Sequence, residues 1–521
     1  MTGSPLTARR REQPESRAAR PSTVPTGAVR QELLREARLV PPPDWEPPAL
    51  DDLVPDVHPG PPAQESFTIA YYDTADQALT RAGITVRYEK DAVEPEWTVQ
   101  LPAAPTVSRL IRRTLRLPGT AEAVPEKALD VLRARIRGRP LRQVAELSTA
   151  RRVVALHDRG DTVLANVVDD DVTATADGGR QLRVREVKID VKDLDRSGSR
   201  LFRAVNDALV ASGCRPAPPT AKLTRVLGIA PDRLLGAIDA REPVATMVGQ
   251  VLMRSLDRLL ACDAQLRFGG DAEDLSDYCA SVARLRADLQ TFAELLDDDW
   301  AQRLAGELSW VAGAAASVHD ATAIRALLTT HVRRDLAGED RPSGLRLLAR
   351  LDQQRDDAEQ TLLAALRSDR YDALLEALDD GCRQPRLASS AWARQLATLP
   401  AGELMTHLMR RASRRLRRSL QRCGHRPSDA ELRRVHRAAE RAQHIADAAV
   451  PVLGTAAVRV VESATRLQRP LLRHRNAAAA EAWLRTAART DVEDALAAGA
   501  LINSVRRDRE QVRSRWPGGS P

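Results

Sequence analysis

The chain has 521 residues, of which 43% are hydrophobic and only 3% aromatic, and it carries a formal net charge of +8. This length allows two or more hydrophobic cores, and cores built from Leu, Ala and Val favour helices for most of the chain. The sequence contains neither an apolar run of about 18 residues nor a signal-like N-terminal segment. We therefore expect no membrane partner and a cytoplasmic location.

Cysteine and arginine usage narrows the possible functions. The cysteines lie far apart and form no CxxC pair, which argues against a zinc site or a disulfide framework. The cations are nearly all arginine, whose planar fork suits phosphate, although the codon bias of a high-GC genome would give the same excess. From Ala401 onward there are 24 arginines against 12 acidic residues. A basic field confined to one region suggests a local anionic partner.

The N-terminal part reads as a tail followed by strands. Residues 1–27 are polar and rich in Pro and Arg, so we expect a disordered tail. The stretch Tyr71–Pro102 predicts three short strands. The first ends with Tyr71–Thr74, the second spans Ile84–Glu89, and the third spans Trp97–Leu101. The last strand should stop at Pro102, because proline cannot donate to a strand ladder. Further strands are predicted at 152–157, 162–168 and 182–191, with helices at 124–138 and 196–211.

The second half reads as a helical bundle. From Val244 onward leucines recur at helical spacing almost to the end, so a domain boundary is expected at 230–245. Ser276–Phe292 and Glu431–Val450 are each followed by a segment that contains a histidine, His319 in one copy and His474 in the other. We interpret this similarity as an internal duplication of helical bundles. Both histidines are expected at helix starts or in packing.

Residues 28–230 resemble the CYTH fold, the triphosphate tunnel family, through YYDT at 71–74, AGITVR at 82–87 and VLANVVDD at 163–170. The resemblance implies an antiparallel β-barrel whose inward side chains hold a metal triphosphate. It implies Glu36 and Glu186 as metal ligands, with Mg or Mn as the cofactor only if the tunnel is active. It also implies phosphate contacts from Arg38, Arg87 and Lys222.

Several positions depart from the CYTH pattern. Leu34 stands in place of the first metal carboxylate, Glu89 in place of a cation, and Gln100 in place of a lysine. Asn166 and Lys188 stand where the family has glutamates. Because metal-assisted hydrolysis needs several oxygen ligands, we predict an inactive domain with no catalytic residue. The alternative is an active metal-dependent triphosphate hydrolase.

Residues 245–515 resemble the CHAD domain, an all-helical module associated with inorganic polyphosphate. The resemblance is strongest at Leu348–Leu378, and the family's binding helices correspond to Leu275–Arg286 and Leu432–Arg441. Cations at helical spacing on these helices and on the basic run before the second one would contact phosphate. The candidates are Arg284, Arg286, Arg410, Arg414, Arg415, Arg417, Arg418, Arg433, Arg437 and Arg441. We place Arg410, Arg414, Arg417 and Arg418 on one stripe, with Arg411 and Arg415 beside it.

Taken together, the sequence predicts an α+β chain: a tunnel-like β-barrel at 28–230 and a duplicated all-α bundle at 245–515. The expected function is binding of inorganic polyphosphate or another polyanion. A basic scaffold that binds nucleic acid or protein is a second alternative. Sequence-specific nucleic-acid recognition is not expected, because no helix-turn-helix, zinc-finger or RNP-type motif is present. The sequence carries no signal for an oligomeric state.

Overall fold

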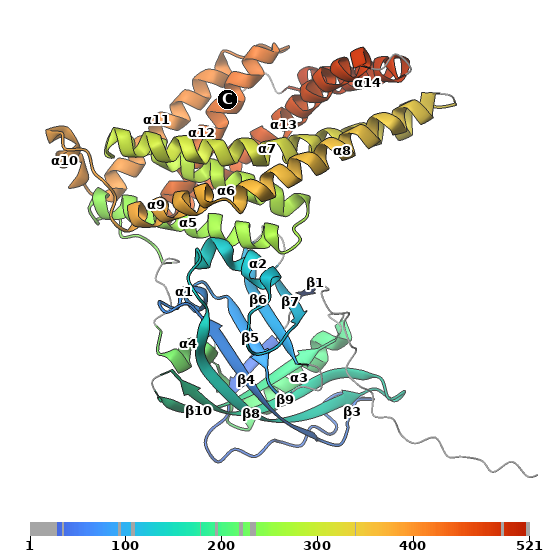
Figure 1. The fold of residues 1–521 in the computed structure, drawn as a ribbon, viewed down its shortest axis with the longest axis vertical. Helices are drawn as coiled ribbons and strands as arrows, with labels where there is room; N and C mark the ends of the chain where they lie inside the picture. Colours follow the sequence, from blue (N-terminus) through green and yellow to red (C-terminus); the bar gives the residue numbers. More distant parts are fainter. Residues whose placement is uncertain are drawn as a thin grey trace, which may run out of the picture.

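The computed structural model places a β-sheet domain beneath a helical bundle (Figure 1). It describes residues 29–33, 36–91, 95–105, 110–177, 179–192, 196–217, 222–229, 236–338, 340–490 and 494–516. The predicted tail at 1–27 lies outside these residues. The strands are β1 (Val29–Leu33), β2 (Glu36–Val40), β3 (His58–Pro59), β4 (Ala63–Asp73), β5 (Thr85–Glu89), β6 (Glu96–Pro105), β7 (Leu110–Pro118), β8 (Arg142–His157), β9 (Val163–Ala176), β10 (Gln181–Val191) and β11 (Arg215–Pro216).

The strands form one antiparallel sheet in the order β1-β7-β6-β5-β4-β8-β9-β10-β2-β11, with β3 pairing with β8. Among the described residues the sheet is not closed, so the prediction of a β-barrel was too strict. β1 pairs with β7 at one end of the sheet, and β2 pairs with β10 and β11 at the other. A closed barrel needs a ladder between its two end strands, and none joins β1 to β2 or β11 in the described part of the chain.

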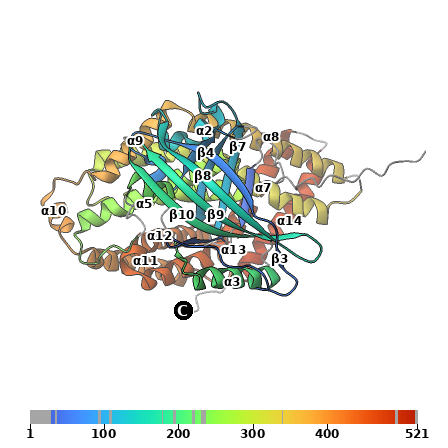
Figure 2. The ribbon, with the colours of Figure 1, turned by 90° about the horizontal axis from the view of Figure 1, so that it is seen from below.

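Small helices cover both faces of this sheet. One face packs Leu39, Val187 and Ile189 against α3 (Arg196–Ala211), which lies beside β9 and β10 (Figure 2). The other face packs Leu147 and Val172 against α4 (Lys222–Leu227). The short helix α1 (Ala78–Arg81) and the helix α2 (Glu126–Ile136) complete this domain. α2 and α3 confirm the two helices predicted here.

The strand β6 does not end at Pro102 as predicted. It continues to Pro105, and the register with β7 shifts between Leu101 and Ala104. A bulge is the arrangement that accommodates proline in a strand, because the residue without an N–H is taken out of the ladder. Proline therefore interrupts the pairing here without ending the strand.

The second half is all helical, and its helices repeat. The bundle contains α5 (Val244–Arg267), α6 (Ala272–Thr291), α7 (Asp298–Asp335), α8 (Asp340–Leu366), α9 (Asp369–Arg383), α10 (Ala391–Ala397), α11 (Ala401–Gln421), α12 (Asp429–Leu453), α13 (Thr455–Thr490) and α14 (Ala495–Ser514). The helices α11, α12 and α13 begin 157 residues after α5, α6 and α7, at Ala401 against Val244, Asp429 against Ala272 and Thr455 against Asp298. We call α5–α8 the first repeat and α11–α14 the second repeat.

The contacts between the starts of α5 and α11 are reciprocal, in agreement with this duplication. Val244 N donates to the carbonyl of Leu399 (2.9 Å), and Ala401 N donates to the carbonyl of Glu242 (2.8 Å). Between them Pro243 and Pro400 form an antiparallel bridge. The two prolines are each other's counterparts, and each hydrogen bond joins a residue to the residue two positions before its own counterpart, as an approximate two-fold axis requires. α6 and α12 also begin with matching capping boxes, Asp271 with Asp274 and Ser428 with Glu431.

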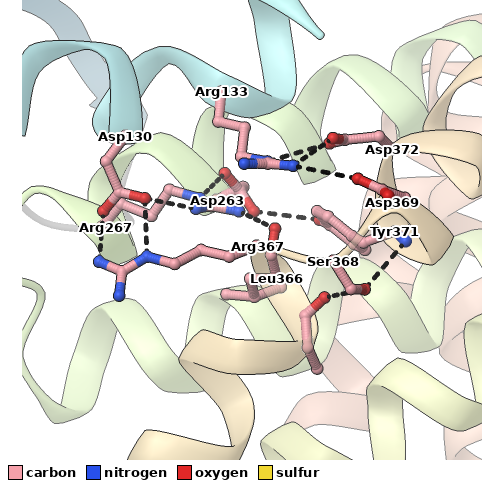
Figure 3. A network of polar contacts seen from close by, with 11 residues as sticks. Asp130, Arg133, Asp263, Arg267, Leu366, Arg367, Ser368, Asp369, Tyr371 and Asp372 are labelled. Carbon is pink, nitrogen blue, oxygen red and sulfur yellow. Dashed lines mark hydrogen bonds and ion pairs between the residues drawn. The ribbon is translucent and has the colours of Figure 1, made fainter. Parts of the chain in front are cut away.

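The two domains meet through a buried ionic network, shown in Figure 3. The side chain of Arg267 on α5 is fully buried and donates to Asp263 (2.7 Å), to Asp130 of α2 (3.2 Å) and to the carbonyl of Leu366 (2.6 Å). Arg133 of α2 binds Asp372 of α9 at 2.6 Å. Buried charges persist only when they are paired and hydrogen-bonded. The sheet domain and the bundle therefore complete each other's charge balance.

Candidate anion-binding site

A groove between α11 and α12 concentrates positive charge on the second repeat. We call it the α11–α12 groove, and its volume is about 610 Å³. Eight of its lining residues are arginines and only one is acidic. The lining consists of His407, Arg411, Arg414, Arg415, Arg418, Ser419, Arg422, Glu431, Arg434, Arg437, Ala438 and Arg441.

The amphipathic pattern of α11 explains why these arginines face one way. Leu404, Met405, Ala412 and Leu416 are buried on one side of the helix. The groove arginines are exposed and lie along the flank of this buried side, at the three- and four-residue spacing of a helical face. The turn after α11 reverses the chain, and α12 then starts at the capping box of Ser428. The arginines of α12 therefore point toward those of α11 across the groove.

The groove has almost no internal charge compensation. Among the described residues, no carboxylate lies within 4.0 Å of a guanidinium nitrogen of the eight groove arginines. The one acidic lining residue, Glu431, accepts hydrogen bonds from the backbone N (2.7 Å) and hydroxyl of Ser428. Arginines that repel one another and lack carboxylates attract polyanions, and a phosphate chain can take several bidentate contacts from such a wall.

The structure places the predicted phosphate-binding residues of the helical bundle in three groups. Arg414, Arg415, Arg418, Arg437 and Arg441 line the groove together. Arg410, Arg417 and Arg433 lie on the same two helices but outside the groove lining. The predicted stripe on α11 was therefore rotated, because Arg411 and Arg415, placed beside it, belong to the groove. Arg422 and Arg434 were missed, and only the way α12 folds back onto α11 could have revealed them.

The third group lies on α6, away from the groove. Arg284 binds Asp288 and Asp447, both at 3.1 Å, where α6 meets α12. Arg286 lies half-buried on the same helix, and its Nε has no hydrogen-bond partner. Burial raises the pKa of Asp288 to about 6, although Arg284 and Ser255 lower it. Arg284, on the first binding helix, thus neutralises buried acids.

The inner face of the sheet domain is also charge-balanced. Arg151 of β8 and Asp170 of β9 are paired in register and lie 2.7 Å apart, and Lys188 approaches the same carboxylate at 3.0 Å. Burial lowers the pKa of Arg151, but Asp170, Glu65 and Glu89 together raise it above its ordinary value. Glu89, which replaces a cation of the CYTH pattern, therefore contributes to a balanced wall.

Of the two expected metal ligands, only Glu186 has a described side chain. Glu186 lies 3.4 Å from Arg225 of α4, so a cation already faces its carboxylate. Glu36 lies in β2 beside Asp190, and its side chain is outside the described part. Within the described residues, no group of three or more His, Cys, Asp or Glu side chains could hold a metal ion. The carboxylate of Glu186 therefore already has a cationic partner in place of a metal ion.

The remaining predicted residues lie on separate strands and helices. Arg38 lies in β2, paired in register with Lys188, and Arg87 lies in β5, paired with Tyr71. Lys222 begins α4, but its side chain is outside the described part. His474 is buried within α13 and lies 3.1 Å from Asp429, so it is a packing residue. His319 lies in the middle of α7, and neither histidine starts a helix.

Within the described residues, no helix combines the length and apolarity needed to cross a bilayer.

Comparison with known proteins identified relatives in Mycobacterium tuberculosis. The uncharacterized protein Rv2226 of strain H37Rv is 29% identical over 346 residues, and the uncharacterized protein MT2285 of strain CDC 1551 is 31% identical over 343 residues. Each match covers 60% of this chain and 63% of the relative, so the chain spans less than two thirds of these proteins.

Solved structures were also matched. PptA from Streptomyces chartreusis is 26% identical, with a TM-score of 0.42, over 52% of this chain and 97% of that chain. The CHAD domain from the plant Ricinus communis is 20% identical, with a TM-score of 0.44, over 56% and 94%. The family model of the CHAD domain matches residues 250–485. Residues 250–485 of this chain therefore form a CHAD domain.

Proposed function

We propose that this protein binds inorganic polyphosphate through the α11–α12 groove of its CHAD domain. The observation that carries the proposal is the wall of eight arginines without a carboxylate within 4.0 Å among the described residues. A linear phosphate chain presents closely spaced negative charges, and each one that a guanidinium neutralises releases counterions and adds affinity. The association of the CHAD family with polyphosphate supports the same ligand class.

The sheet domain contributes no chemistry in this proposal. Its inner-face acids Asp170 and Glu186 are held by Arg151, Lys188 and Arg225. A triphosphate would find few free cations on this wall, and a divalent metal would find few free carboxylates. We propose that the domain is inactive and supports the bundle through α2. Incubation with tripolyphosphate and Mg²⁺ or Mn²⁺ should release no phosphate, and sustained release would establish the hydrolase alternative.

A charge-reversal pair on α11 tests the binding site. The variant Arg414→Glu/Arg418→Glu changes two groove residues, and Arg410→Glu/Arg417→Glu changes two exposed arginines of the same helix outside the groove. Both variants alter the net charge equally and leave the buried face of α11 intact. We expect the groove variant to lose at least about tenfold in affinity for long-chain polyphosphate, since charge-assisted hydrogen bonds each contribute about 1.5–3 kcal/mol.

The control variant Arg410→Glu/Arg417→Glu should lose at most a few-fold in affinity for polyphosphate, because it only weakens the positive electrostatic field around the groove. Equal losses in both variants would mean that diffuse charge, not the groove, binds the ligand.

Duplex DNA serves as the competitor for the nucleic-acid alternative. The groove lining contains no Phe, Tyr or Trp that could stack on bases. We therefore expect DNA to compete weakly, and equal competition would favour the basic-scaffold alternative.

A further inference from the structure

The offset of 157 residues gives each groove residue a counterpart in the first repeat, between α5 and α6. Of the counterparts of the eight groove arginines, only Arg254, Arg258 and Arg284 are arginines. Two are aspartates, with Asp257 standing for Arg414 and Asp277 for Arg434. The other three are uncharged. The same face is therefore strongly cationic in the second repeat and nearly neutral in the first.

The remaining cations of the first-repeat face are largely occupied. Arg254 donates to the carbonyl of Gly236 at 2.5 Å. Arg284 is bound by Asp288 and Asp447. Only Arg258 is exposed without a carboxylate within 4.0 Å among the described residues. One arginine beside two aspartates cannot hold a phosphate chain.

Two acidic positions of the first-repeat face bind the sheet domain instead. Asp257 accepts from Arg135 of α2 at 2.5 Å. Asp274, the counterpart of Glu431, accepts from Arg113 of β7 at 2.8 Å, and this pair is about nine-tenths buried. Each aspartate thus receives an arginine of the sheet domain, and Figure 1 shows α2 directly beneath α5. At this interface Asp257 has the opposite charge to its groove counterpart Arg414, whereas Asp274 keeps the acidic charge of Glu431.

Two apolar positions also differ between the repeats, one repeat burying them against the sheet domain and the other exposing polar residues. Ala264 and Phe268 of the first repeat are buried with the sheet-domain residues Leu115 and Leu117 in one hydrophobic cluster. Their counterparts in the second repeat are Gln421 and His425, which are exposed. Burial of a phenylalanine favours docking of a folded domain. A polar, arginine-rich surface at the equivalent place does not.

We infer that the two repeats use one equivalent face for two different partners. The first repeat docks the chain's own sheet domain through Asp257, Asp274 and Phe268, and the second repeat holds the single polyanion site of the chain. Asp257 and Asp277 are the specificity-determining substitutions that exclude anions from the first repeat. The anion half of this inference rests on the proposed function, whereas the docking half does not.

The anion half is tested by counterpart variants of the full chain. Arg415→Glu and Arg258→Glu make the same change at equivalent exposed positions of the two repeats. With polyphosphate of short, defined length, calorimetry should give one site per chain. Arg415→Glu should weaken binding about tenfold, and Arg258→Glu should change it less than about twofold, because an isolated exposed charge contributes little. Two sites per chain, or equal losses, would overturn the division, whereas absence of binding by the wild type would refute the proposed function itself.

The docking half is tested without ligand. Asp274→Asn and Glu431→Gln replace equivalent capping-box carboxylates with amides of the same shape, so both lose the same capping charge. Only Asp274 also binds a buried arginine of the sheet domain. Asp274→Asn should lower the midpoint of thermal unfolding clearly more than Glu431→Gln, since it leaves Arg113 buried without its partner. Equal shifts would show that Arg113 does not dock the domain.

Discussion

At the scale of single residues, the cluster between α6 and α12 shows how buried charge limits a site predicted from sequence. Arg284 matches the family's binding helix, yet it is bound by two aspartates. Asp288 is fully buried and also accepts from the hydroxyl of Ser255 at 2.5 Å. Spacing along a helix predicts which cations share a face. It does not predict which acids a second helix brings to them, so Arg284 could not be excluded from sequence.

Asp288 makes stability depend on pH in a predictable direction. Burial raises its pKa to about 6 in the folded protein, so the carboxyl holds its proton longer when folded than when unfolded. Stability associated with this group is therefore present at low pH and is lost as pH rises from about 4 to about 6. Asp288→Asn cannot ionise. Its free energy of unfolding relative to wild type should rise by on the order of 3 kcal/mol between pH 4 and pH 7.

Urea unfolding of both proteins at a series of pH values measures this difference. Asp372→Asn, at a partly exposed aspartate that binds Arg133, controls for general effects of removing a paired carboxylate. A difference between Asp288→Asn and wild type that stays constant across this pH range would show that Asp288 ionises normally in the fold.

At the scale of elements, close contacts between helices explain positions that the sequence pattern left open. Gly381 lies on α9 against the ring of Trp300 on α7, and a Cβ at this glycine would lie 2.2 Å from a ring carbon. Helical spacing predicted that this region is helical, because apolar periodicity is a local property. The need for glycine at 381 depends on a helix that is distant in the chain, and no local pattern reports it. The bulge at Pro102 in β6 has the same origin in pairing with β7.

Gly381→Ala should destabilise the protein, because the added methyl group must displace a buried tryptophan. Overpacking of this kind costs about 1–3 kcal/mol, which outweighs the gain of about 0.5–1 kcal/mol from removing glycine from a helix. Gly313→Ala on α7 is the matched control, since nothing lies within 4 Å of its added Cβ. Thermal unfolding should show a lower midpoint for the first variant and an equal or higher one for the second. A stabilised Gly381→Ala would contradict the packing of α9 on α7.

At the scale of the whole molecule, sequence patterns predicted the α+β class and the duplication, and the fold confirms both. The resemblance to the CHAD domain is confirmed by the family model over residues 250–485. They also placed the basic field in the last quarter of the chain. The patterns could not separate arginines that dock domains from arginines that remain unpaired. Arg133 and Arg135 of α2 look as available in the sequence as Arg414 and Arg415, yet the first two bind aspartates of the bundle. Only the packing of the two domains makes that distinction.

The most direct test of the central claim is the affinity of the full chain for long-chain polyphosphate, measured from low to high salt. If the eight groove arginines hold the ligand, the logarithm of the association constant should fall steeply and linearly with the logarithm of salt concentration. The Arg414→Glu/Arg418→Glu variant should bind more weakly and show a shallower slope, because fewer counterions are released. Affinity that is independent of salt, or identical in the two proteins at every salt concentration, would contradict the account.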